Sequence, residues 1–216
     1  AVLFGGLLIV APLALTGGWR RAAPSGDRWW TVAYFGLLGI AFLFVEMPLV
    51  QRYILLVGRP TTALATVLFA LLAASGVGSL LSPRLPWRPS ACALTATALA
   101  MPFAMGPLTT LLLPAPGPVR VLLGSAALAP LGVLMGVMFP KGRANLRCRT
   151  PDLVPWAWGI NGVASVVSAV ASALLALSVG FKFVVLVGAA CYGLSTLLVR
   201  PDRRTSDGAP GLTRAG

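Results

Sequence analysis

The chain alternates between long apolar runs and short polar stretches. The apolar runs are rich in Leu, Val, Ala and Phe, and they are bounded by Arg, Lys, Pro and Gly. A helix of about 20 such residues crosses the roughly 30 Å hydrocarbon core of a bilayer. The pattern therefore predicts an all-α, polytopic membrane helix bundle of about seven transmembrane helices. We expect these spans near 1–16, 30–50, 61–82, 91–114, 119–139, 156–179 and 181–199.

The two ends of the chain differ from this pattern. Residues 200–216 are rich in Gly, Pro, Ser, Thr, Arg and Asp, and we expect a disordered polar tail because little apolar surface is available to bury. The chain opens at Ala1 inside an apolar run, without the basic segment that begins a signal peptide. We interpret residues 1–16 as a span whose start has been removed, and the chain as a piece of a longer protein.

Composition excludes several classes of protein. Hydrophobic residues make up 57% of the chain and charged residues only 10%, against roughly 25% in an ordinary soluble domain. A soluble globular enzyme and a disordered chain are both excluded. The net charge of +12 does not indicate nucleic-acid binding, because the basic residues lie between apolar runs. The lipid bilayer is the partner that they indicate.

The basic residues are distributed unevenly between the two predicted sides. With seven spans, 13 of the 17 Lys and Arg residues fall in the odd-numbered connections and the tail. The other four are Arg52, Arg59, Arg120 and Lys182. Because positive loops stay in the cytoplasm, the odd connections and the C-terminus are predicted to be cytoplasmic, in a bacterial inner membrane. All six Trp residues fall at span ends on that same side, where indole rings prefer to lie.

Glu46 is the only acidic residue inside an apolar run. A carboxylate there is unfavourable by a few kcal/mol unless it is paired or protonated. One interpretation is an interhelical ion pair with Arg120 or Lys182, which share its predicted depth. The other is a site for a cation substrate or a proton, formed by Glu46, Gln51, Arg52 and Asn161 next to the helix-kinking Pro48.

Small residues and one amide mark the later spans. Asn161 is followed at helical spacing by Gly162, Ser165 and Ser172, and the fifth span carries Gly132 and Gly136. Such residues favour close helix packing, and an amide can hydrogen-bond between helices. The alternative is a pocket lined by Asn161 with Trp156 and Trp158.

No residue pattern predicts catalysis within the chain. There is no His, and the three cysteines Cys92, Cys148 and Cys191 are far apart in the sequence. No nucleophile motif or phosphate-binding loop is present. The sequence therefore predicts no catalytic residue, no metal site and no cofactor.

Four segments carry a resemblance to a known family. They are 39–52, then 57–60 with 75–79, then 131–140, and finally 154–162, which contains Trp156, Trp158, Asn161 and Gly162. Together they resemble the membrane region of membrane-embedded spermidine synthase-like proteins, over residues 35–199. Members of that family fuse such a region to a soluble aminopropyltransferase domain. The resemblance also marks Glu46, Gln51 and Arg52 as motif positions without an assigned role.

Three functions follow from these observations. The resemblance implies a membrane module that anchors or serves an aminopropyltransferase-like domain outside this chain. Glu46 and Pro48 favour a transporter of a small cation or polyamine. The small-residue faces favour an accessory subunit held among other membrane subunits.

Overall fold

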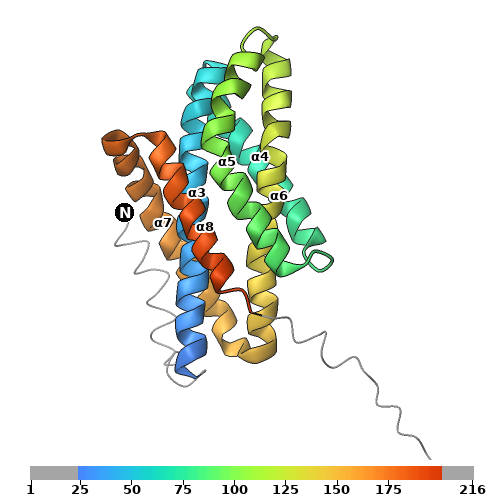
Figure 1. The fold of residues 1–216 in the computed structure, drawn as a ribbon, viewed down its shortest axis with the longest axis vertical. Helices are drawn as coiled ribbons and strands as arrows, with labels where there is room; N and C mark the ends of the chain where they lie inside the picture. Colours follow the sequence, from blue (N-terminus) through green and yellow to red (C-terminus); the bar gives the residue numbers. More distant parts are fainter. Residues whose placement is uncertain (1–23, 201–216) are drawn as a thin grey trace, which may run out of the picture.

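The structure, a computed structural model, describes residues 24–200, which fold into a helical bundle (Figure 1). The predicted first span at 1–16 and almost all of the predicted tail lie outside these residues. Within 24–200 there are six α-helices, one short 3-10 helix and no strand. The helices are α3 (Ser25–Val57), α4 (Pro60–Leu81), α5 (Trp87–Leu112), α6 (Gly117–Arg149), α7 (Val154–Val179) and α8 (Phe181–Leu197), and η1 (Pro151–Leu153) precedes α7.

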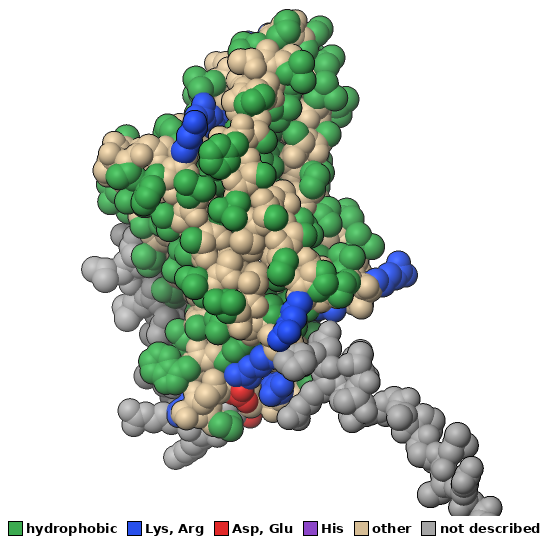
Figure 2. All heavy atoms as spheres, viewed as in Figure 1, with side chains coloured by type: hydrophobic (Ala, Val, Ile, Leu, Met, Phe, Trp, Pro, Cys, Tyr) green, Lys and Arg blue, Asp and Glu red, His purple; other side chains and the backbone are tan. Residues whose placement is uncertain are grey.

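Five of the six α-helices, α3 to α7, are long and apolar enough to cross a membrane, whereas α8 is shorter at 17 residues. The class of protein is therefore a multi-pass helical membrane bundle, as the sequence predicts. Large apolar side chains such as Phe69, Leu80, Leu122 and Leu177 lie exposed on its sides. Apolar side chains cover much of the face in Figure 2, which is typical of a surface in contact with lipid tails.

Successive helices run in opposite directions along one axis (Figure 1). We call the end where α3 begins and α8 ends the lower end, and the end where α3 ends and α6 begins the upper end. The long helices α3 and α6 run through the whole bundle, whereas the α4–α5 connection stops above the lower end and the α7–α8 connection stops below the upper end. The two hairpins are therefore staggered along the axis.

Helices α3 and α6 extend beyond the apolar runs from which they were predicted. Each has 33 residues, or about 50 Å, so both exceed the thickness of the bilayer core. The polar stretches at 51–60 and 140–155, which the sequence analysis treats as connections, are mostly helical. Polarity ends an apolar run but not a helix, because Gln, Arg, Lys and Leu are all good helix formers.

Glycine and proline set the breaks between helices. Helix α3 ends at Gly58, whose φ of +78° is in the left-handed region and whose amide donates to the carbonyl of Ile54 at 2.8 Å. Pro60 then begins α4, where its missing N–H is not needed. Gly180, with φ +87° and ψ 159°, separates α7 from α8. By contrast, α3 runs without a break through Pro48.

Helices α4 and α6 approach each other more closely than side chains normally allow. A Cβ added to Gly78 would lie 2.0 Å from the carbonyl oxygen of Val133, and one added to Gly136 would lie 2.0 Å from that of Ser75. Gly132 lies against Ala74 in the same interface. Glycine is required here because the backbones themselves are in contact, as at small-residue interfaces in membranes.

Candidate functional site

Glu46 lies on α3 with a side chain only 3% exposed. Its Oε1 atom has no hydrogen-bond partner, and no ion pair of Glu46 occurs within residues 24–200. The ion pair with Arg120 or Lys182 expected from the sequence is therefore absent from the described part of the chain. The structure leaves a buried carboxyl group with one unpartnered oxygen inside an apolar helix.

Arg120 is engaged by backbone carbonyls instead. Its Nε donates to the carbonyl of Ala115 at 2.7 Å and its Nη1 donates to that of Leu56 at 3.3 Å. Leu56 is ten residues beyond Glu46 on α3, or about 15 Å along the axis. Arg120 thus binds a carbonyl that the end of α3 leaves free, and it is too far along α3 to neutralise Glu46.

The residues of the predicted polar site are dispersed along the bundle. Gln51 is exposed, whereas Arg52 is half-buried and lines a cleft with Lys182 of α8. Asn161 donates from Nδ2 to the carbonyl of Phe35 at 3.1 Å. Phe35 is eleven residues before Glu46, about 16 Å along α3, so Asn161 and Glu46 do not share a site.

Asn161 belongs to an interface between α7 and α3. Ser165 and Ser168 both donate to the carbonyl of Gly39, at 3.3 and 3.4 Å. A Cβ on Gly39 would lie 2.5 Å from the carbonyl oxygen of Asn161, so the two backbones touch. Ser172 is fully buried further along α7 and donates to the carbonyl of Ala169 at 3.0 Å. Asn161, Ser165 and Ser168 join α7 to α3 through hydrogen bonds to backbone carbonyls, whereas the hydrogen bond of Ser172 stays within α7.

The two tryptophans next to Asn161 have different surroundings. Trp158 is 56% exposed and contacts Phe139, with 4.4 Å between ring centroids. Trp156 is half-buried and packs against the core, and Gly162 is also half-buried. The amide of Asn161 is bonded to α3, whereas the ring of Trp158 contacts Phe139 of α6.

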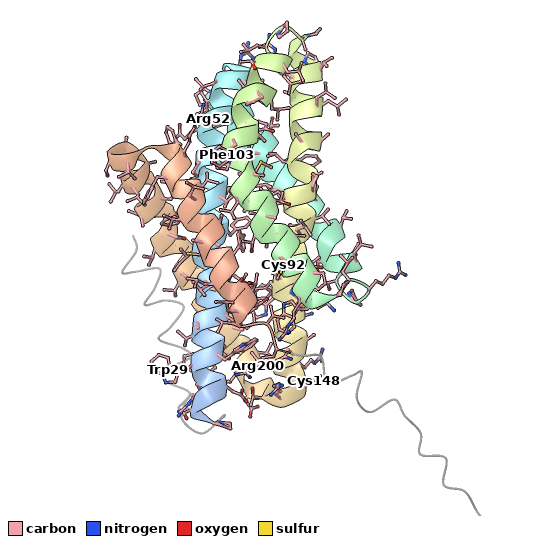
Figure 3. All side chains as sticks on the ribbon, viewed as in Figure 1. Trp29, Arg52, Cys92, Phe103, Cys148 and Arg200 are labelled. Atoms are coloured by element: carbon pink, nitrogen blue, oxygen red, sulfur yellow. The ribbon has the colours of Figure 1, made fainter. Side chains whose placement is uncertain are left out.

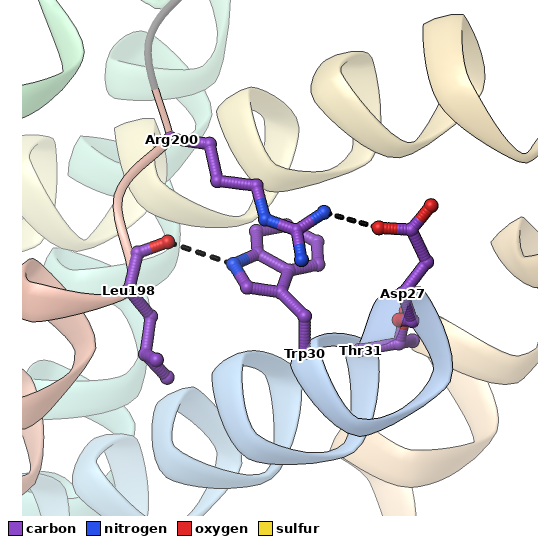
Figure 4. Close-up of polar contacts among 5 residues, drawn as sticks. All are labelled: Asp27, Trp30, Thr31, Leu198 and Arg200. Carbon is purple, nitrogen blue, oxygen red and sulfur yellow. Dashed lines mark hydrogen bonds and ion pairs between the residues drawn. The ribbon is translucent and has the colours of Figure 1, made fainter. Parts of the chain in front are cut away.

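A further group of polar contacts is at the lower end, where the sequence analysis expects only a tail. Arg200 forms an ion pair with Asp27, and its guanidinium lies 4.6 Å from the ring centroid of Trp30 (Figure 4). The indole Nε1 of Trp30 donates to the carbonyl of Leu198 at 2.7 Å. We call Asp27, Trp30, Leu198 and Arg200 the clasp. It fastens the end of α8 to the beginning of α3.

An aromatic cluster extends the clasp into the core. Trp30 stacks on Tyr34 at 5.0 Å between centroids, and Trp87 of α5 donates from Nε1 to the Tyr34 hydroxyl at 3.1 Å. That hydroxyl donates in turn to the carbonyl of Met138 on α6 at 3.0 Å. The cluster therefore ties α3, α5, α6 and the end of α8 together. The signal in the sequence was the placement of Asp27, Arg200 and several Trp residues on one predicted side.

Three further buried polar atoms near the end of α6 have no hydrogen-bond partner: Oδ1 of Asn145, Nε of Arg149 and Oγ1 of Thr150. Among residues 24–200 no three His, Cys, Asp or Glu side chains come together as metal ligands. Comparison of the chain with protein families, curated proteins and solved structures found no match. The class of the protein therefore stands on its helices and composition.

Proposed function

We propose that the chain is a membrane-anchoring module of a spermidine synthase-like protein, which holds an aminopropyltransferase-like domain at the membrane. The clasp is the observation that supports this proposal. It joins the points where the chain enters and leaves the described bundle, at residues 24–27 and 198–200, at one end. An end joined in this way suits a bundle that supports a neighbouring domain.

The proposal includes seven spans, with residues 1–16 as the first, in a bacterial inner membrane. The lower end and the C-terminus then face the cytoplasm, because most of the basic residues lie on that side. Exposed Arg143 and Arg147 lie near the lower end of α6. These cations and the clasp form the face that a cytoplasmic domain or another membrane subunit would meet.

The test begins with the coding sequence that contains this chain and the genes next to it, in which an aminopropyltransferase-like domain is sought. A reading frame encoding an aminopropyltransferase-like domain should be expressed with residues 1–200 present or deleted. We expect transfer of aminopropyl groups to putrescine in the membrane fraction, and its release into the soluble fraction on deletion. The purified chain alone should show no turnover. Activity of the chain alone, or activity that stays in the membrane after the deletion, would contradict an anchoring role.

Transport of a small cation or polyamine is the second candidate, and Glu46 favours it. A buried carboxyl group with a free oxygen, two residues before Pro48, is the arrangement expected where an intramembrane helix binds a cation. Purified chain in proteoliposomes should then take up labelled putrescine, and Glu46→Gln should abolish uptake. Tyr53→Phe, on the same helix, is the control that should retain it. Absence of uptake by the wild-type chain would contradict transport.

A further inference from the structure

A cleft opens near the upper end between α3, α5 and α8. Its cationic lining residues are Arg52 of α3 and Lys182 of α8, and its apolar walls include Leu49, Met101, Met105 and Val185. Figure 3 shows Arg52 on the upper part of α3. Figure 2 shows Lys and Arg side chains at this height among apolar ones. Arg52 and Lys182 thus border a cleft whose own surface is apolar.

The two cations have no protein partner in the described part of the chain. Neither Arg52 nor Lys182 makes a hydrogen bond or an ion pair with residues 24–200. Of the three carboxylates there, Asp27 and Asp152 lie at the lower end. The third, Glu46, makes no ion pair and lies six residues before Arg52, about 9 Å along the axis. A half-buried guanidinium without a partner is favourable only if water or an anion satisfies it.

The shape of the cleft selects the kind of ligand. The cleft has an empty volume of about 280 Å³, and this volume includes space open to solvent. A ligand in the cleft therefore has one side against the protein and another side open. This suits a molecule that already lies along the side of the bundle better than a solute enclosed in a cavity.

The order of residues along the helices matches the order of groups in a lipid. Val185 lies about one turn deeper than Lys182 on α8, which runs towards the lower end, and Leu49 lies about one turn deeper than Arg52 on α3. On α5, Met101 lies about one turn deeper than Met105. The charges are therefore at the mouth near the upper end, and the apolar wall continues towards the middle of the bundle.

We propose that this cleft binds an anionic phospholipid. The phosphate lies between Arg52 and Lys182, and the first part of one acyl chain lies along Leu49, Val185 and the two methionines. Arg52 donates in-plane N–H groups to the phosphate oxygens, and Lys182 supplies a second, mobile positive charge. This inference is independent of the anchoring function, because it concerns the opposite end of the bundle.

The test is lipid binding by the purified full chain, followed by native mass spectrometry. Phosphatidylglycerol is compared with phosphatidylcholine of the same acyl chains and with glycerol phosphate. We expect the anionic lipid to bind most tightly. The double variant Arg52→Gln/Lys182→Gln should weaken its binding about tenfold or more, since hydrogen bonds to charged groups are lost. The matched double variant Arg59→Gln/Arg84→Gln, at two exposed cations outside the cleft, should bind as the wild type does.

A cleft-filling variant, Met105→Trp, separates lipid from free anion. It should weaken binding of phosphatidylglycerol and leave binding of glycerol phosphate unchanged. Equal binding of glycerol phosphate and phosphatidylglycerol would overturn the assignment to a lipid. Unchanged lipid binding by the Arg52→Gln/Lys182→Gln variant, or an equal loss in the Arg59→Gln/Arg84→Gln variant, would overturn the site itself.

Discussion

The ion pair expected between Glu46 and Arg120 does not form in the described part of the chain, and Arg120 hydrogen-bonds to backbone carbonyls instead. Arg120 binds the carbonyls of Ala115 and Leu56, near the end of α3, and Glu46 keeps one oxygen without a hydrogen bond. A guanidinium has five donors, so free carbonyls at a helix end can satisfy it without a carboxylate. Charge and predicted depth alone therefore did not identify the partner of Arg120.

Glu46→Gln should leave the stability of the bundle within about 0.5 kcal/mol of the wild type, because no ion pair is lost. Thermal unfolding in detergent measures this. Tyr53→Phe is the comparison: it removes the hydrogen bond from the Tyr53 hydroxyl to the carbonyl of Gly124 at 2.6 Å. That variant should lose about 1 kcal/mol. A loss for Glu46→Gln as large as that for Tyr53→Phe would indicate a stabilising partner for the carboxylate.

The clasp should be weak as an ion pair but measurable. The Asp27 and Arg200 side chains are 20% and 23% exposed, and Arg200 also lies over Trp30. A double-mutant cycle of Asp27→Asn and Arg200→Gln should give a coupling of about 0.5–1 kcal/mol. A second cycle, which combines Asp27→Asn with Arg88→Gln at an exposed cation, should give no coupling energy. Equal coupling in the two cycles would mean that net charge, and not the clasp, is responsible.

At the scale of elements, the contact between α4 and α6 is governed by glycines. Two glycines of α4, only two residues apart, have opposite surroundings: Gly78 touches the backbone of Val133, whereas no atom lies within 4 Å of a Cβ on Gly76. The difference arises because helical neighbours two residues apart point in different directions. A substitution at Gly76 is therefore a control for the same substitution at Gly78.

Gly78→Ala should destabilise the bundle by about 1–3 kcal/mol, because α4 and α6 must move apart. Gly76→Ala should be neutral or stabilising by up to about 1 kcal/mol, because alanine favours the helix. Thermal unfolding of both variants in the same detergent gives the comparison. If the two substitutions had the same sign and size, the close approach of the two helices at Gly78 would be wrong.

At the scale of the whole molecule, the alternating helices place α6's end and α4's start at opposite ends of the bundle. Exposed Cys148 lies at the lower end (Figure 3), and exposed Arg59 lies at the upper end, immediately before α4. In the proposed topology, which follows the positive-inside rule, Cys148 is expected to face the cytoplasm. The same reasoning applies to Arg147, its neighbour on α6.

Accessibility labelling tests this orientation. With Cys92 and Cys191 replaced by Ala, Cys148 should react only after the inner side is opened to a membrane-impermeant thiol reagent. In a chain that also has Cys148→Ala, Arg59→Cys should react from outside intact cells. An Arg147→Cys variant in that background should behave like Cys148. Labelling of Arg59→Cys and Cys148 from the same side would contradict the alternation of the spans.

The apolar runs by themselves determined the class of this protein. A stretch of about 20 residues that cannot leave its backbone groups unpaired in lipid must be helical, so length and polarity were sufficient. The six runs from residue 30 onward each overlap one helix of the structure. The ends of α3 and α6 could not be located in this way, because helix propensity continues through Gln51, Arg52 and Lys141 after hydropathy falls.

Tertiary structure alone decided which polar residues meet. Asn161, Ser165 and Ser168 of α7 bond to carbonyls of α3, Arg120 bonds to the end of α3, and Arg200 forms an ion pair with Asp27 at the beginning of α3. These partners depend on the rotation and stagger of each helix against its neighbours. Those quantities follow from close contacts such as Gly39 with α7 and Gly78 with α6. Rotation and stagger are properties of a pair of helices, whereas the hydropathy pattern along the sequence describes each helix separately.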